Sequence, residues 1–103
     1  MISESKFKSF KEFYPFYLSE HSKSLTKICH AFGSICVIGI LFFSLFTYNF
    51  KILYLAPIAG YGFAWISHFL IEKNRPATFK YPFYSFMGEW VMLKEILTGK
   101  IKV

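Results

Sequence analysis

Charged residues are scarce in this chain, and two long stretches contain none. They make up 17% of the 103 residues, whereas hydrophobic residues make up 54%. Asp, Glu, Lys and Arg are absent from residues 31–48 and from residues 52–71. A helix needs roughly 17–25 such residues to cross a bilayer core, and a soluble domain this small has little interior for so much apolar surface. The sequence therefore predicts an all-α fold, an integral membrane hairpin of two transmembrane helices.

The first stretch lacks the features of a cleaved signal peptide. Its apolar part is longer than the roughly 7–15 residues of a signal h-region. It also follows a segment of mixed charge, and no small-residue cleavage site comes after it, because FTYNFKILYL is bulky throughout. We therefore expect a retained membrane segment.

Acidic residues are half as frequent as basic ones, and this imbalance has a pattern along the chain. Six Asp and Glu stand against 12 Lys and Arg, for a net charge of +6. Basic residues flank both apolar stretches, but the connection over residues 49–51 has only Lys51. The positive-inside rule then places both termini in the cytoplasm, with the protein in a cell inner membrane or the endoplasmic reticulum. No zinc-finger, basic-zipper or aromatic RNA-binding signature is present, so we expect no nucleic-acid partner.

Cysteine is rare too, and its two copies are poorly placed for a disulfide. Cys29 and Cys36 are seven residues apart on one expected helix, which separates them by roughly 10 Å along the axis. A disulfide needs a shorter separation. We expect two free thiols that act as small apolar residues.

The flanking segments are expected to be amphipathic and interfacial. The boundaries that we predict are an interfacial segment over residues 1–27, spans over residues 28–48 and 52–71, and an amphipathic helix over residues 83–98. An aromatic stripe at helical spacing among lysines predicts that the first segment lies in the membrane interface: Phe7, Phe10, Phe13, Tyr14 and Tyr17. Pro15 is expected to break that helix or to start a second short turn. Ser22 or Ser24 is the expected N-cap of the first span.

The helix over residues 83–98 contains charges and is too short to span, so we expect it to lie on the membrane or to dip into it. Its apolar face comprises Phe83, Phe86, Met87, Trp90, Leu93 and Leu97. Glu89 lies largely off that face. The outward apolar residues are expected to contact lipid, or with Phe83, Phe86 and Trp90 to roof an acyl groove.

Small residues recur every four positions in the second span, at Ala56, Gly60 and Ala64. They share one helix face, and small side chains let membrane helices approach closely. The same register continues to His68 and Glu72. The pattern predicts that this face contacts another helix. That helix could belong to a second copy of the chain, so a homo-oligomer formed through this face is one possibility.

Histidine occurs only three times, at His21, His30 and His68. In a hairpin, His30 and His68 lie roughly 28 and 26 Å from the connection at 1.5 Å per residue, and therefore at one depth. His21 precedes the first span and can fold back to that level. Imidazole is the commonest protein ligand for iron, copper, nickel and zinc. The three side chains predict a metal site, with Glu72 or Glu20 as a fourth or outer ligand; the alternative is that interfacial histidines only hydrogen-bond headgroups.

The two segments that carry these histidines resemble the Mpo1-like family. The resemblance runs over residues 13–98 and is carried by FYPFYLSEHSKSLTKICHAFG and by LAPIAGYGFAWISHFLIEKNRPATFKYP. Its most specific part is an H-x3-E-K-x-x-P-A run, found here as His68, Glu72, Lys73, Pro76 and Ala77. The pair His21 and His30, nine residues apart, is its second part. This chain would be a short form, with two spans where the longer members are expected to have more.

The resemblance implies a membrane-embedded, Fe(II)-dependent dioxygenase that uses O₂ to shorten 2-hydroxy fatty acids by one carbon with loss of CO₂. It implies that His21, His30 and His68 are the catalytic metal ligands. As a further hypothesis, Arg75 or Lys73 binds the substrate carboxylate, since guanidinium pairs well with carboxylates; the alternative is that both only anchor the helix end at headgroups. Two other functions stay open: a non-catalytic membrane protein that binds lipid or a partner through basic amphipathic helices, and a metal-binding or redox-sensing module without turnover.

Overall fold

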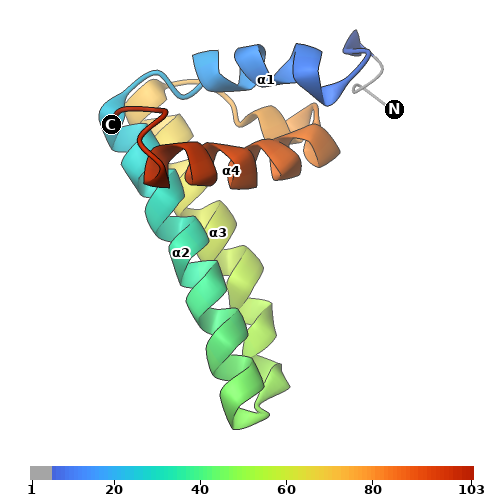
Figure 1. Cartoon of the computed structure of the whole chain (residues 1–103), viewed down its shortest axis with the longest axis vertical. Coiled ribbons are helices and arrows are strands. Elements are labelled where there is room, and N and C mark those ends of the chain that lie inside the picture. The colour runs from blue at the N-terminus through green and yellow to red at the C-terminus, as the bar shows by residue number, and fades with distance from the viewer. Residues whose placement is uncertain (1–5) are drawn as a thin grey trace.

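Every regular element in the computed structural model is helical among residues 6–103, the part of the chain that the structure describes. Two long antiparallel arms form a hairpin, and the shorter helices α1 and α4 lie across one end of it (Figure 1). The elements in chain order are α1 (Phe10–Ser19), α2 (Ser24–Thr47), η2 (Phe50–Tyr54), α3 (Leu55–Ile66), η3 (Ser67–Glu72), η4 (Ala77–Phe79) and α4 (Pro82–Leu97). The predicted all-helical architecture is confirmed for these residues.

The hairpin pairs α2 with a second arm in which η2, α3 and η3 follow one another directly. Helix α2 ends before Tyr48, which adopts the left-handed conformation with φ 57° and lets the chain reverse. The arms pack closely at Gly33, where an added Cβ would lie 3.1 Å from the Cβ of Phe63. Both arms are long and apolar enough to cross a membrane by length and composition.

Helix α2 begins earlier than the predicted first span, and its N-terminus is capped in an unexpected way. The N-cap is Lys23, which makes no side-chain capping bond, so the expectation of a Ser22 or Ser24 cap is wrong. The Glu72 carboxylate accepts from the backbone N–H of Lys23 at 2.7 Å and from the Ser22 hydroxyl at 3.0 Å. A carboxylate at a helix N-terminus is favoured by the exposed N–H groups and the helix dipole.

Helices α1 and α4 pack together around an aromatic core at one end of the hairpin. The buried residues of this core are Phe13, Tyr17, Ala77, Tyr81 and Met92. The N-terminal aromatic stripe is therefore packed inside the protein at Phe13, which is 0% exposed, and at Tyr17. An interfacial position for the segment over residues 1–27 stays a prediction, and its first five residues lie outside the described part of the chain.

Pro15 lies inside α1 instead of breaking it. Proline removes one backbone hydrogen bond, to the carbonyl four residues earlier. That carbonyl belongs to Lys11, an exposed residue, so water can satisfy it. Packing of Phe13 and Tyr17, on either side of Pro15, holds the helix together. The predicted break is wrong for this reason.

Helix α4 turns its weakly apolar face inward and much of its strongly apolar face outward. Ser85, Gly88, Met92 and Leu93 are buried, whereas Phe83 is 73% exposed and most of the predicted apolar face points away from the core. Gly88 makes this orientation possible, since an added Cβ would lie 3.0 Å from the Tyr17 ring. The residue next to this contact, Glu89, is thereby directed into the molecule.

Candidate metal centre

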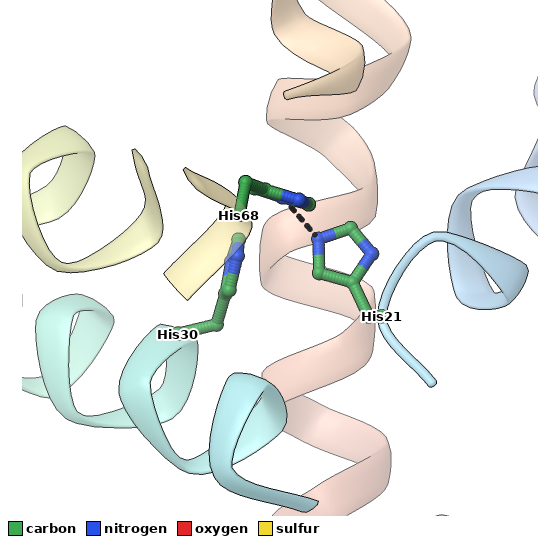
Figure 2. Close-up of side chains that lie close together, drawn as sticks. All are labelled: His21, His30 and His68. Atoms are coloured by element: carbon green, nitrogen blue, oxygen red, sulfur yellow. Dashed lines mark hydrogen bonds between the residues drawn. The ribbon is translucent and has the colours of Figure 1, made fainter. Parts of the chain in front are cut away.

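The three histidines of the chain converge at the junction of α1, the hairpin and α4. Their ring centroids are 4.4 Å apart for His21 and His30, 4.5 Å for His21 and His68, and 5.1 Å for His30 and His68. All three are buried, with exposures of 0%, 3% and 2% in chain order. Figure 2 shows the rings turned toward one another from three separate segments. The predicted clustering of the histidines is confirmed.

Each histidine comes from a different local structure. His21 lies in the turn between α1 and α2, His30 lies on α2, and His68 lies in η3, a π-helical segment at the end of the second arm. A π-turn shifts the helix register, and such turns are frequent at functional sites. It is followed by Lys73 in the left-handed conformation, with φ 62°. This return of the chain brings Asn74 back onto His68, where its backbone N–H donates to the His68 carbonyl at 2.9 Å.

The Nδ1 atom of every histidine faces a hydrogen-bond acceptor. His21 Nδ1 lies 2.6 Å from the Tyr17 carbonyl oxygen, which can only accept. His68 Nδ1 lies 2.7 Å from Asn74 Oδ1, and the Asn74 amide NH₂ donates to the Glu20 carbonyl at 3.2 Å, which fixes the amide orientation. All of these contacts require a proton on Nδ1. In a neutral ring with this tautomer, Nε2 is unprotonated and free to bind a cation.

His30 has the strongest of these partners, because its Nδ1 donates to a carboxylate. The His30 Nδ1 to Glu89 Oε1 distance is 2.7 Å. Glu89 also accepts from the Tyr17 hydroxyl at 3.1 Å and from the Ser34 hydroxyl at 2.5 Å. Burial raises the pKa of Glu89, but the hydrogen bonds from His30, Ser34 and Tyr17 outweigh it and hold the pKa below its usual range. Glu89 is thus an ionised acceptor that fixes the His30 tautomer.

The Nε2 atoms form a buried cluster of lone pairs that suits a cation. His21 Nε2 and His68 Nε2 are 3.0 Å apart, and His30 Nε2 is buried without a hydrogen-bond partner among the described residues. One ligand atom from each ring lies within 4.8 Å of the others. Burial and the neighbouring His30 lower the pKa of His21 to about 2, so this imidazole is neutral at physiological pH. Neutral imidazoles whose other nitrogen donates to an outer acceptor are the usual protein ligands of transition metals.

The carboxylates predicted to join the histidines have other contacts in the structure. Glu72 binds the N-terminus of α2, as described above, and the metal-binding group found among residues 6–103 contains only the three histidines. Glu20 contributes its backbone carbonyl to Asn74. Lys73 and Arg75 are exposed side chains. A role for these four residues at the metal or on a substrate stays a prediction.

Glu89 and Asn74 were not predicted as site residues, although each has a local signal in the sequence. Glu89 is the acidic residue within the helix that lies next to glycine, and Gly88 permits close packing that buries its neighbour. Asn74 follows the break in the apolar run, at a position where asparagine often closes a turn. Neither signal identifies a histidine as the partner. The contact of Glu89 with His30 joins residues 59 positions apart, and the contact of Asn74 with His68 joins residues six positions apart across a chain reversal.

A cavity of about 330 Å³ opens from the histidine cluster along the hairpin. Its polar end includes His21, His30, His68, Ser85 and Glu89. Its apolar walls include Ala56, Gly60 and Ala64 on α3 and Phe86 and Trp90 on α4. The small-residue face of the second arm therefore lines a cavity inside the chain; self-association through that face stays a prediction.

One of three comparisons with known proteins gave a match. A search of the curated proteins and a search of the solved structures each gave no significant match. Residues 7–101 match a family model described as 2-hydroxy-palmitic acid dioxygenase Mpo1-like. The matched range contains the three histidines and both of their side-chain partners, Asn74 and Glu89. Because the match covers nearly the whole chain, the chain belongs to the Mpo1-like family.

Proposed function

We propose that this chain is an Fe(II)-dependent dioxygenase that shortens 2-hydroxy fatty acids by one carbon. The observation that carries the proposal is the convergence of three buried imidazoles, each with its Nδ1 on an acceptor, in a chain of the Mpo1-like family. Three protein ligands leave coordination positions open for other molecules, which is typical of catalytic metal sites. A cavity with apolar walls adjoins the cluster and suits a fatty-acid substrate.

The reaction balances without an external reductant. A 2-hydroxy acid and O₂ give the acid one carbon shorter, CO₂ and one molecule of water; the bond between C1 and C2 breaks and O₂ is reduced. Iron held by the three histidines would supply the redox chemistry and would orient both reactants.

The residues around the histidines have defined roles in this proposal. The Tyr17 carbonyl, Asn74 and Glu89 hold the three rings in one tautomer and orientation, so that their Nε2 atoms need no rearrangement on binding a metal. Burial of the rings keeps bulk water away from the reacting atoms. Tyr17 takes part twice, because its carbonyl accepts from His21 and its hydroxyl donates to Glu89.

We further propose that the hairpin crosses a membrane and that the histidine cluster lies near the cytoplasmic interface. Helix α2 has 24 residues, which is roughly 36 Å of helix and enough for a hydrocarbon core of about 30 Å. Large apolar side chains in its second half are exposed, among them Phe42, Phe43, Leu45 and Phe46. A bilayer would cover this surface, with both termini on the cytoplasmic side.

A role for the exposed cations next to η3 is also part of the proposal. If Arg75 or Lys73 binds the substrate carboxylate, then replacing Arg75 by Gln is expected to raise the apparent KM for a 2-hydroxy acid. An unchanged KM for Arg75→Gln would limit Arg75 to contacts with headgroups.

The test is product analysis with purified protein. Protein loaded with ferrous iron under anaerobic conditions is then given O₂ and a 2-hydroxy fatty acid. Mass spectrometry is expected to detect the acid shortened by one carbon. His21→Ala, His30→Ala and His68→Ala should each lower product formation by more than about 100-fold, since losing even an outer partner of a metal ligand costs roughly 10–100-fold.

The control for these variants is Glu95→Gln. Glu95 lies on α4 but contacts Tyr14 and Lys100, away from the cluster, so this variant should keep wild-type turnover. Iron bound without any product would contradict the enzymatic proposal and favour a metal-binding module. Absence of bound iron in the wild-type protein would favour a non-catalytic membrane protein.

A further inference from the structure

The cavity beside the histidine cluster is polar at one end and apolar along its length. It extends from His68 to Ala56 on the second arm, which are twelve residues apart and so separated by roughly 18 Å along a helix. Val37 and Tyr61 are among its other lining residues. A cavity of about 330 Å³ is at the small end of the usual range for ligand sites. Its shape and lining suit a single long chain with one polar end.

Small side chains give the cavity its width. Ala56, Gly60 and Ala64 lie one above another on α3, and each lines the space. At Gly60 the opposite wall is already near, because an added Cβ would lie 3.2 Å from Val37 Cγ2. Glycine at this position therefore lets α3 approach α2 closely. A larger side chain at Ala56 or Ala64 would reduce the cavity that both residues line. The face predicted to contact a helix does so at Gly60, which packs against α2, and it also lines the cavity.

Ser85 provides an independent sign of a ligand at the polar end. Ser85 is 3% exposed, and its hydroxyl is buried without a hydrogen-bond partner among the described residues. Ser85 lines the cavity. The neighbouring Ser34 and Tyr17 hydroxyls already donate to Glu89, so the Ser85 hydroxyl remains available. A buried hydroxyl without a partner is unfavourable, and a polar ligand group would relieve it.

We infer that the cavity binds one unbranched acyl chain, with its polar head at Ser85 and the histidines and its tail along Ala64, Gly60 and Ala56, and that Ala56 limits the chain length. This inference rests on the proposed function for the identity of the head, a 2-hydroxy carboxylate. Ser85 donates to that head. The tail lies against the wall of α3 beneath Phe86 and Trp90.

Fatty-acid binding to the metal-free protein tests this inference without turnover. Trp65 and Trp90 both line the cavity and are the only two tryptophans of the chain, so tryptophan fluorescence reports on the site. Straight-chain 2-hydroxy acids of increasing length are titrated into chelator-treated, detergent-solubilised protein. In the wild type, affinity is expected to rise with chain length and then to level off.

Ala56→Leu is the informative variant, and Gly62→Val is its matched control. Each adds three carbon atoms to the same helix, but an added Cβ at Gly62 meets nothing within 4 Å. Ala56→Leu should weaken binding of the longest acids at least tenfold and leave the shortest unchanged. Gly62→Val should follow the wild type at every length. If Ala56→Leu also follows the wild type, or no acid alters the fluorescence, the channel is refuted.

Ser85→Ala tests the position of the head group. The Ser85 hydroxyl has no hydrogen-bond partner to lose within residues 6–103, so this variant should fold as the wild type does. It should weaken binding of 2-hydroxy acids of every length by about tenfold. Equal affinity of Ser85→Ala and wild type would overturn the assignment of the head to Ser85.

These results are separable from the fate of the proposed reaction. Length-dependent binding that responds to Ala56→Leu, with no product formed under iron and O₂, would refute the dioxygenase activity and leave the channel standing. Product formation whose chain-length preference is the same in Ala56→Leu and wild type would support the activity and refute the channel.

Discussion

Glu89 is the residue that most clearly distinguishes this cluster from three histidines that happen to be close. It accepts from His30, Tyr17 and Ser34 at once. A carboxylate can accept several hydrogen bonds, whereas the amide of Gln has one oxygen and an NH₂ group that can only donate. The three donors thus specify a carboxylate at this position.

Glu89→Gln is therefore expected to weaken metal binding while leaving the chain folded. One or more of the three donors would lose its acceptor, and the His30 ring would lose its fixed tautomer. Loss of such an outer partner typically costs 10–100-fold in metal affinity. Anaerobic titration with ferrous iron measures the change, and Glu95→Gln on the same helix serves as the control. Equal affinities of the two variants would show that Glu89 does not act on the metal site.

At the scale of elements, the site depends on how tightly α4 packs on α1. Gly88 packs against the Tyr17 ring. This contact sets how close the Glu89 carboxylate comes to His30. Met92 is buried beside it in the same core. A small outward shift of α4 would thus separate the carboxylate from His30.

Gly88→Ala is expected to destabilise the protein and to weaken metal binding. The new Cβ would lie 3.0 Å from a rigid, buried ring, and overpacking of this kind typically costs about 1–3 kcal/mol. Thermal unfolding in detergent measures the effect. Gly39→Ala is the control, because an added Cβ there meets nothing within 4 Å and alanine favours a helix over glycine by about 0.5–1 kcal/mol. A Gly88→Ala protein as stable as Gly39→Ala would contradict the packing argument.

The hairpin and the common level of His30 and His68 along it could be predicted because both depend on one-dimensional patterns. Charge-free stretches define the arms, and counting residues from the connection placed His30 and His68 at one level. The orientation of α4 could not be predicted in this way. Its apolar residues predicted contact with lipid or a roof over a groove, but they did not indicate that Gly88 packs on Tyr17 and turns Glu89 inward. The contact of Glu89 with His30 depends on that orientation. The cap formed by Glu72 likewise joins residues that are far apart in sequence.

For the whole molecule, the two ends of the hairpin differ in how their apolar side chains are covered. The half with α1 and α4 has a packed core and the histidines, and the other half is the bare end of the hairpin (Figure 1). Exposed apolar surface of this extent requires a cover. In our proposal a bilayer covers it, and the polar site lies at the membrane boundary.

Site-directed labelling should then find the two ends of the hairpin on opposite sides of the membrane. Cys29 and Cys36 are first replaced by Ala, and a single cysteine is introduced as Lys51→Cys or as Lys102→Cys. A membrane-impermeant maleimide should label Lys102→Cys only from the cytoplasmic side and Lys51→Cys only from the other side. Labelling of both from one side, or release of the protein from membranes by alkaline carbonate, would contradict the spanning hairpin.

The most direct measurement is X-ray absorption spectroscopy at the iron edge of protein loaded anaerobically with one equivalent of ferrous iron. If the three Nε2 atoms form the site, the spectrum should show about three imidazole ligands per iron, and one ligand fewer in each of His21→Ala, His30→Ala and His68→Ala. Iron that stays in solution, or a wild-type spectrum with no imidazole scattering, would contradict a metal centre built from these histidines.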